Sequence, residues 1–251
     1  MKEVTATMTM LIANEWTKLR TVRGPWLLIA VQQVVIVAGV SGLAAAGTDL
    51  KTSDGVRTLM SHAGLVSAIF TLVLGITAVA GEYRHRTITD TYLAAPRRGR
   101  VVGAKLAAYT GLGLVAGVLS ATVGTAVTAL CLAVDGGSLD LSSGMVWRIA
   151  AGIVAFNIVY AAVGVALGAL VRNLTAAVTA ALVWILLVET VVANLLGDLG
   201  RWLPNRAGLA LGYMPSTVPV LPQWGAGLLL VGYAVVIVVA AGATTVRRDV
   251  T

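Results

Sequence analysis

Few side chains in this 251-residue sequence have the type and spacing needed for chemistry. Glu189 is the only ionisable residue well inside a long apolar run, and Asn157 and Gln33 are polar residues in similar surroundings. A charge at the centre of a bilayer costs at least about 2.5–3.5 kcal/mol, even on a lenient insertion scale. The Glu189 carboxyl group is therefore expected to be protonated, to hydrogen-bond to a neighbouring helix, or to face a wet cavity. It serves either as glue between helices or as part of a path for solutes.

Catalytic and metal-binding spacings are absent from the sequence. It contains no His-Glu-x-x-His motif and no paired carboxylates within its apolar runs, and Cys131 is its only cysteine. A zinc site or a disulfide built on cysteines is therefore excluded. The nearest approach to a nucleotide-binding loop, residues 99–106, lacks the Gly-Lys pair and the following Ser or Thr that hold phosphate and magnesium. We expect no enzyme activity, no metal and no cofactor in this chain itself.

The elements that must position these residues are long apolar segments. The chain is 58% hydrophobic and only 12% charged, with a mean hydropathy of +0.89, whereas about a quarter of an ordinary soluble domain is charged. A bilayer core needs about 20 apolar residues per helical span, and backbone in lipid must satisfy its own hydrogen bonds. The sequence therefore predicts an all-α, polytopic membrane protein with six spans: Trp26–Ala46, Met60–Ala80, Leu106–Val134, Ile149–Val171, Leu174–Leu196 and Gly225–Thr244.

The basic residues predict the orientation of these spans. Short loops rich in Lys and Arg stay on the cytoplasmic side during insertion. Residues 81–105 form a polar island with five arginines and Lys105, and most of the 18 basic residues fall on that side if both termini are cytoplasmic. The net charge of +7 is then a topology signal, so we expect contact with membrane lipids and no nucleic acid.

Residues 1–25 are expected to form a separate helix in the membrane surface plane. Ile12, Trp16 and Leu19 recur at helical spacing on one side, and three charged residues of the same segment, Glu15, Lys18 and Arg20, complete the candidate surface. The pair at 24–25, Gly-Pro, predicts a break before the first span. The alternative is a simple cytoplasmic extension of that span.

The polar island also carries a predicted short helix. The run 87–90 has the Thr-x-x-acid pattern of a helix start, and Pro96 closes the segment. Ile88, Tyr92 and Leu93 supply apolar contacts, and because so short a helix is marginal alone, we expect it to dock on a protein partner. The alternative is a basic loop on anionic headgroups.

The last loop, residues 197–224, combines four prolines with the apolar stretch 207–214. It is expected either to dip into the membrane as short helical pieces or to form a plain solvated loop, and the sequence leaves both open.

Four segments together resemble a known family. The opening 15–23 (EWTKLRTVR), the run 81–88 (GEYRHRTI), the segment 96–100 (PRRGR) with Lys105, and the closing 247–249 (RRD) look like type-2 ABC transporter permeases, especially the short actinobacterial kind. The resemblance covers nearly the whole chain, and its middle motif is the most specific part. Arg86 stands where that family would place a glycine.

The resemblance implies a six-helix exporter subunit in a bacterial plasma membrane. It implies a second copy of the chain, or a close relative, and two copies of a separate ATPase that binds ATP and Mg. It makes the loop 81–96 the coupling element, with contacts from Glu82, Tyr83, Arg84, His85, Arg86, Thr87, Ile88, Tyr92 and Leu93. The alternative class is a nucleotide-independent secondary transporter or channel, which would want several ionisable groups within the membrane.

Overall fold

A computed structural model of the chain describes residues 2–85, 87, 98–216 and 218–247. Within these ranges the secondary structure is helical with turns, and no strand occurs. Six of the helices are long and apolar enough to cross a membrane: Arg23–Ala45, Ser53–Arg84, Gly99–Val134, Gly144–Val171, Leu174–Trp202 and Gln223–Ala243. The predicted class is confirmed, because each predicted span falls on one of these helices. The chain is an all-α, multi-pass membrane protein.

The elements follow one another as the sequence pattern predicts, with extra turns at several ends. In chain order they are α1 (Lys2–Thr21), α2 (Arg23–Ala45), α3 (Ser53–Arg84), α5 (Arg98–Val134), α6 (Gly144–Val171), α7 (Leu174–Val183), the π-helical turn η1 (Trp184–Val188), α8 (Glu189–Leu196), the 3₁₀ helix η2 (Gly197–Trp202), α9 (Pro204–Leu211) and α10 (Gln223–Arg247).

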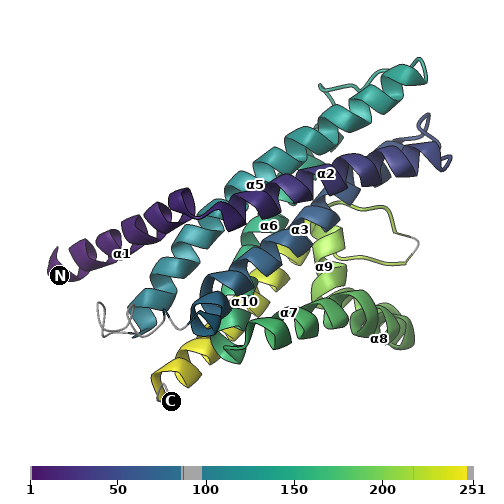
Figure 1. Cartoon of the computed structure of the whole chain (residues 1–251). Coiled ribbons are helices and arrows are strands. Elements are labelled where there is room, and N and C mark those ends of the chain that lie inside the picture. The colour runs from purple at the N-terminus through teal and green to yellow at the C-terminus, as the bar shows by residue number, and fades with distance from the viewer. Residues whose placement is uncertain (1, 86, 88–97, 217, 248–251) are drawn as a thin grey trace.

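Helices α3 and α6 form the centre of the bundle, and α2, α5, α7 and α10 surround them (Figure 1). The central pair approaches closely because glycines face each other across it. A methyl group at Gly164 would collide with the carbonyl oxygen of Leu72 and with Gly75 Cα, and one at Gly168 would meet the carbonyl oxygen of Ile76 at 2.6 Å. Within a bilayer no hydrophobic force drives helices together, because lipid tails are as apolar as the side chains. Small residues that let helices approach closely are therefore favoured at helix contacts.

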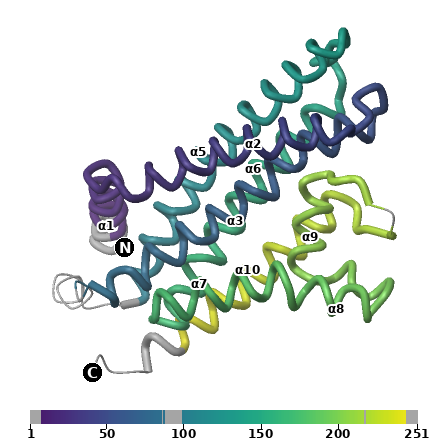
Figure 2. The backbone as a smooth tube through the Cα atoms, turned by 45° about the vertical axis from the view of Figure 1, so that its right-hand side comes forward, coloured from purple at the N-terminus to yellow at the C-terminus, as the bar shows by residue number. Residues whose placement is uncertain are grey.

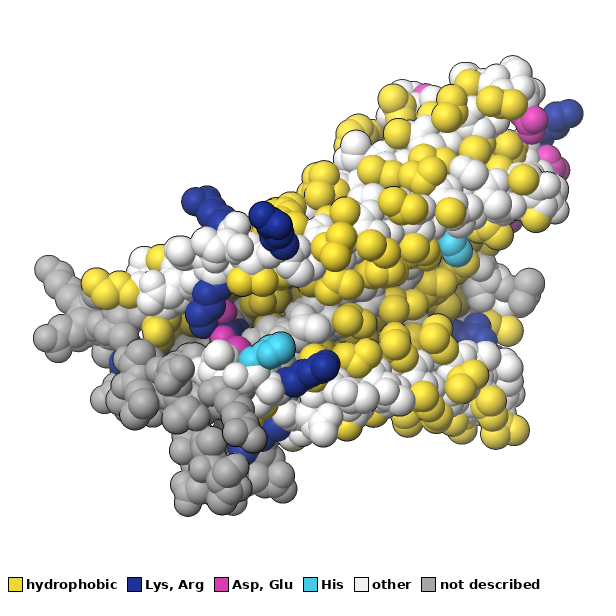
Figure 3. All heavy atoms as spheres, viewed as in Figure 1, with side chains coloured by type: hydrophobic (Ala, Val, Ile, Leu, Met, Phe, Trp, Pro, Cys, Tyr) yellow, Lys and Arg dark blue, Asp and Glu magenta, His cyan; other side chains and the backbone are white. Residues whose placement is uncertain are grey.

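The two ends of the bundle carry different elements. In Figures 1 and 2, α1, the end of α3, the start of α5 and the end of α10 lie together at one end, here called the α1 end. The turns before α3 and α6 lie at the opposite end with α8 and α9, here called the α9 end. In the space-filling view most of the visible side surface is apolar, and charged side chains gather toward the ends (Figure 3). This distribution fits a body that is covered by hydrocarbon.

The polar island is shorter than its sequence suggests, because helices enter it from both sides. Helix α3 continues to Arg84 and α5 starts at Arg98, so Glu82, Tyr83, Arg84 and Lys105 are helical rather than parts of a loop. The predicted short helix with Arg86, Ile88, Tyr92 and Leu93 lies outside the described residues.

Helix α1 is a separate helix, as predicted, but it ends earlier than the sequence indicated. The break falls at Val22, and Gly24 and Pro25 lie in the first turn of α2. A proline is tolerated there because the first amides of a helix have no intrahelical partner. The Trp26 indole donates to the Leu19 carbonyl oxygen at 2.7 Å and fixes this corner.

The apolar side of α1 lies against α5. Leu19 is buried, Ile12 and Trp16 are half-buried, and a methyl at Gly111 of α5 would meet the Trp16 ring at 3.0 Å. Lys18 and Arg20 are exposed. The residues that the sequence assigned to a membrane surface therefore contact the bundle itself, and the orientation of α1 in the membrane stays a prediction.

The segment 197–222 contains the predicted short helical pieces, η2 and α9. Ala207, Ala210 and Leu211 of α9 are buried against the bundle. Arg57 of α3 donates to the Tyr213 carbonyl oxygen at 3.3 Å and stacks 4.4 Å from the centre of its ring. The segment is thus packed on protein rather than being a plain solvated loop.

Candidate functional site

Four charged side chains meet at the α1 end and form a closed cluster. Lys105 of α5 lies 2.7 Å from Glu82 of α3 and 3.0 Å from Glu15 of α1. Lys18 of α1 lies 2.8 Å from Glu15 and 3.0 Å from Glu82. Each lysine therefore bridges both carboxylates. Three helices that are distant in the sequence are tied together at this point.

The helical spacing of α1 and the depth of α5 make this cluster possible. Glu15 and Lys18 are three residues apart, so they lie on one side of α1, beside buried Leu19. Lys105 lies two turns into α5 and is only 1% exposed. Its ammonium group is almost completely shielded from water, and the two carboxylates supply the opposite charge that a buried ion requires.

Lys18 occupies the outer edge of the cluster. Burial lowers the pKa of its ammonium group, but hydrogen bonds and opposite charges from Glu15 and Glu82 raise it more, so the pKa lies above the usual 10.5. Lys18 is therefore charged at neutral pH. One oxygen of Glu82, Oε2, is buried without a hydrogen-bond partner in the part of the chain that the structure describes.

Residues that follow Glu82 form the exposed surface next to the cluster. Arg84, His85 and Thr87 are exposed, and His85 and Thr87 border a hollow of about 220 Å³ that Glu15, Lys18, Glu82 and Lys105 also line. Tyr83 faces another neighbour, because the Arg172 guanidinium lies 5.6 Å from the centre of its ring. The predicted coupling residues are thus divided between an inward contact, Glu82, and outward ones.

Glu189 is the polar centre of the α9 end. It is 1% exposed, directly follows the π-helical turn η1, and accepts hydrogen bonds at Oε1 from the backbone amides of Asn205 and, at 3.0 Å, Arg206. These amides belong to the first turn of α9, whose own preceding residue, Leu203, offers no side-chain cap. Glu189, which belongs to α8, therefore caps the N-terminus of α9. The amide dipoles of α9 stabilise the negative charge of the carboxylate.

The other end of α9 is held in the same way. The Gln223 amide group donates to the Leu211 carbonyl oxygen at 2.9 Å and to the Arg148 carbonyl oxygen at 2.8 Å. Both termini of this short helix are thus satisfied by side chains of neighbouring elements. The predicted role of Glu189 as a hydrogen-bonded link between helices matches this geometry.

Asn157 and Gln33 lie in hydrogen-bonded contacts between spans. Asn157 of α6 donates to Ser67 at 2.8 Å and accepts from Thr71 at 2.6 Å, both on α3. Gln33 of α2 donates to Ser120 of α5 at 3.2 Å. Neither residue lines the hollow beside the charge cluster. Their contacts are those of links between helices.

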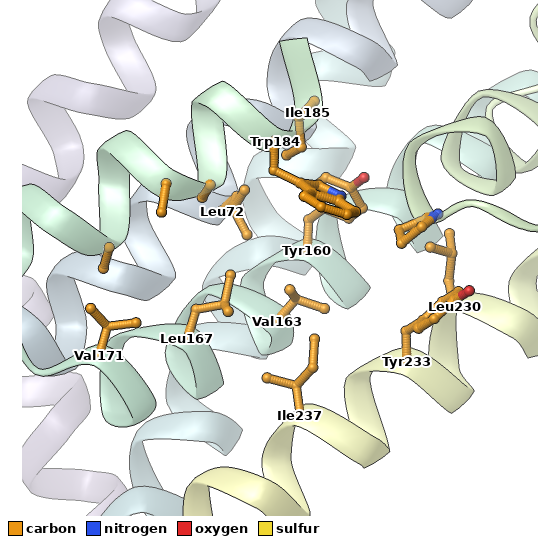
Figure 4. Close-up of a pocket in the computed structure, with 14 residues that line it drawn as sticks. Leu72, Tyr160, Val163, Leu167, Val171, Trp184, Ile185, Leu230, Tyr233 and Ile237 are labelled. Atoms are coloured by element: carbon orange, nitrogen blue, oxygen red, sulfur yellow. The ribbon is translucent and has the colours of Figure 1, made fainter. Parts of the chain in front are cut away.

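An apolar pocket of about 340 Å³ opens between α6, α7 and α10 (Figure 4). Its walls are aliphatic, from Val171 and Leu167 at one end to Leu230 and Ile237 on α10, and the rings of Tyr160, Trp184 and Tyr233 gather at the other end. Tyr233 donates to the Trp202 carbonyl oxygen at 3.0 Å. The pocket fits a hydrocarbon group.

The sequence missed the role of Lys105. It counted as one more basic residue of the polar island, although the unbroken apolar run that follows it was a signal that it lies within a helix and needs a partner.

The sequence matches no protein-family model and no curated protein. The class of the chain therefore rests on its fold.

Proposed function

We propose that the chain is the permease subunit of an ATP-driven ABC exporter. Two copies enclose the export path, each coupled at its α1 end to a separate ATPase chain that binds ATP and Mg. The α1 end faces the cytoplasm of a bacterial cell, as the basic residues indicate.

One observation carries this proposal. Three of the segments that resemble type-2 permeases, 15–23, 81–88 and 96–105, contribute Glu15, Glu82 and Lys105 to a single buried cluster. A loop that receives force from a partner needs a stiff attachment to the spans, and ion pairs between α1, α3 and α5 provide one. The exposed Arg84, His85 and Thr87 next to it leave a surface for that partner.

The cargo class follows only in general terms. The aliphatic lining of the pocket between α6, α7 and α10 favours a hydrocarbon group over a polar solute. An apolar or amphipathic cargo suits it.

Purification of the complex tests the proposal directly. We expect mild-detergent extracts to yield two copies of this chain and two of an ATPase with a Walker A motif, identified by mass spectrometry. Arg84→Glu/His85→Glu should lose the ATPase without loss of folded protein, whereas Arg148→Glu at the α9 end should keep it. A monomer that transports in liposomes without ATP would instead establish the secondary transporter or channel.

Cysteine labelling tests the orientation. In a Cys131→Ser background, cysteines at exposed Ser53, Ser138 and Ser216 should react with an impermeant thiol reagent added to intact cells. Labelling of Arg98→Cys from outside would overturn the assignment of the α1 end to the cytoplasm.

A further inference from the structure

A second pocket, of about 150 Å³, lies at the α9 end and has charged walls. The pocket is lined by Arg201 of η2, Arg206 of α9, Asp198 and Asn194, together with residues 218–220. It is separate from both the charge cluster and the apolar pocket, with which it shares no lining residue.

The guanidinium groups of Arg201 and Arg206 remain available to bind a ligand. Neither guanidinium forms an ion pair with a described residue, and the buried Nε of Arg201 has no hydrogen-bond partner among the same residues. Arg201 only stacks 5.8 Å from the centre of the Trp202 ring, and Arg206 feels the charge of Glu189, whose Oε1 is already occupied by backbone amides. Guanidinium groups in this state are ready for a phosphate, which they bind through several parallel hydrogen bonds.

The depth of the pocket places it at the level of lipid headgroups. Trp147, Trp202 and Trp224 are all exposed at the α9 end, and tryptophans gather where hydrocarbon meets water. Beside the pocket, Leu195 and Leu199 are exposed on α8 and η2. A ligand in this position would have its polar part between the arginines and its hydrocarbon part along the leucines.

The charges of the walls select among headgroups. Asp198 is exposed at the mouth of the same pocket, so positive and negative charges stand side by side. A bare anion would be repelled by that carboxylate, whereas a zwitterion with a primary amine would satisfy it. We propose that this pocket binds phosphatidylethanolamine, with the phosphate between Arg201 and Arg206 and the amine on Asp198. This assignment does not depend on the ATPase partner.

Native mass spectrometry of the purified chain with equal amounts of phosphatidylethanolamine, phosphatidylglycerol and diacylglycerol tests the proposal. We expect phosphatidylethanolamine to be retained best and diacylglycerol least. Arg201→Gln/Arg206→Gln should lower phosphatidylethanolamine retention about tenfold or more, because both guanidinium groups that hold the phosphate are removed. Arg148→Gln, which removes an exposed arginine outside the pocket, should change nothing. If the double variant does not fold, Arg201→Gln alone should still lower retention.

Three outcomes would overturn the assignment. Equal phosphatidylethanolamine retention by the wild type and the arginine variants would remove the phosphate site. A wild-type preference for phosphatidylglycerol, or a preference that survives Asp198→Asn, would remove the amine contact. Soluble glycerophosphoethanolamine that displaces the lipid at equal concentration would show that the occupant is a free phosphate ester rather than a lipid.

Discussion

The two ends of this bundle bury charge in different ways. At the α1 end, Lys105 is compensated by carboxylates from two other helices. At the α9 end, Glu189 forms no ion pair with any lysine or arginine that the structure describes, and backbone amides of α9 compensate it. A charge answered by charges depends on each of its partners. A carboxylate that accepts hydrogen bonds from helix amides can be replaced by another side chain with an acceptor oxygen, because the backbone amides are present whatever that side chain is.

The largest expected effect is at Lys105. Lys105→Met removes the buried lysine of the cluster and leaves Glu15 and Glu82 with only the exposed Lys18 as a described ion-pair partner, and removal of one member of a buried pair costs about 3–5 kcal/mol. Thermal unfolding of the detergent-purified protein, followed by tryptophan fluorescence, should show a strongly lowered midpoint. The triple variant Glu15→Gln/Glu82→Gln/Lys105→Met should recover most of the loss. A midpoint unchanged in Lys105→Met would mean that the cluster contributes nothing to stability.

At the α9 end, Glu189→Ala should be less damaging. It leaves the amides of Asn205 and Arg206 without an acceptor, at about 1–3 kcal/mol. Hydrogen exchange of residues 204–211 should speed up selectively. Glu189→Gln keeps an acceptor oxygen and should stay close to wild type in both folding and transport. If Glu189→Gln folds normally but loses transport, the carboxyl group acts on the cargo and not as a cap.

The glycine contact between α3 and α6 lies in the helices that connect the two ends. Its disruption should change the stability by an intermediate amount. Gly164→Ala pushes a methyl group against the Leu72 carbonyl oxygen, and such overpacking costs about 1–3 kcal/mol. Gly42→Ala in α2, where no atom lies within 4 Å, should be neutral or slightly stabilising. Equal unfolding midpoints for both variants would contradict the close packing of the central pair.

The smallest effect is at Lys18, whose side chain is half exposed. Its pKa in the folded protein lies above the unfolded value of 10.5, so its contribution to stability is complete below about pH 10.5 and is lost as pH rises above that value. Lys18→Met should therefore lower the unfolding midpoint slightly at pH 8, and the difference from wild type should shrink above pH 10.5. A difference that grows with pH would show that Lys18 is destabilised by its surroundings.

The predicted spans agree with the structure more closely than the predicted positions of the site residues do. Glu15, Lys18 and Glu82 were singled out as surface contacts, yet their side chains pair with one another or with Lys105, and Lys18 alone among them is exposed. Arg84, His85 and Thr87 are exposed, and their contact with a partner stays a prediction. The difference arises because residue type shows that a side chain is charged, but not which other helix end lies beside it.

The sequence by itself determined the class and the six spans, since in lipid each backbone group must be satisfied within its own helix and hydropathy alone marks such segments. For Glu189 it left three states open: a protonated carboxyl group, a hydrogen-bond partner on a neighbouring helix, or a wet cavity. Only the tertiary structure decided which partner, because Glu189 and the start of α9 meet through the fold of residues 190–204, and Glu15 meets Lys105 across 90 residues of chain. Such contacts depend on how whole helices pack, and the glycines of α3 and α6 set that packing.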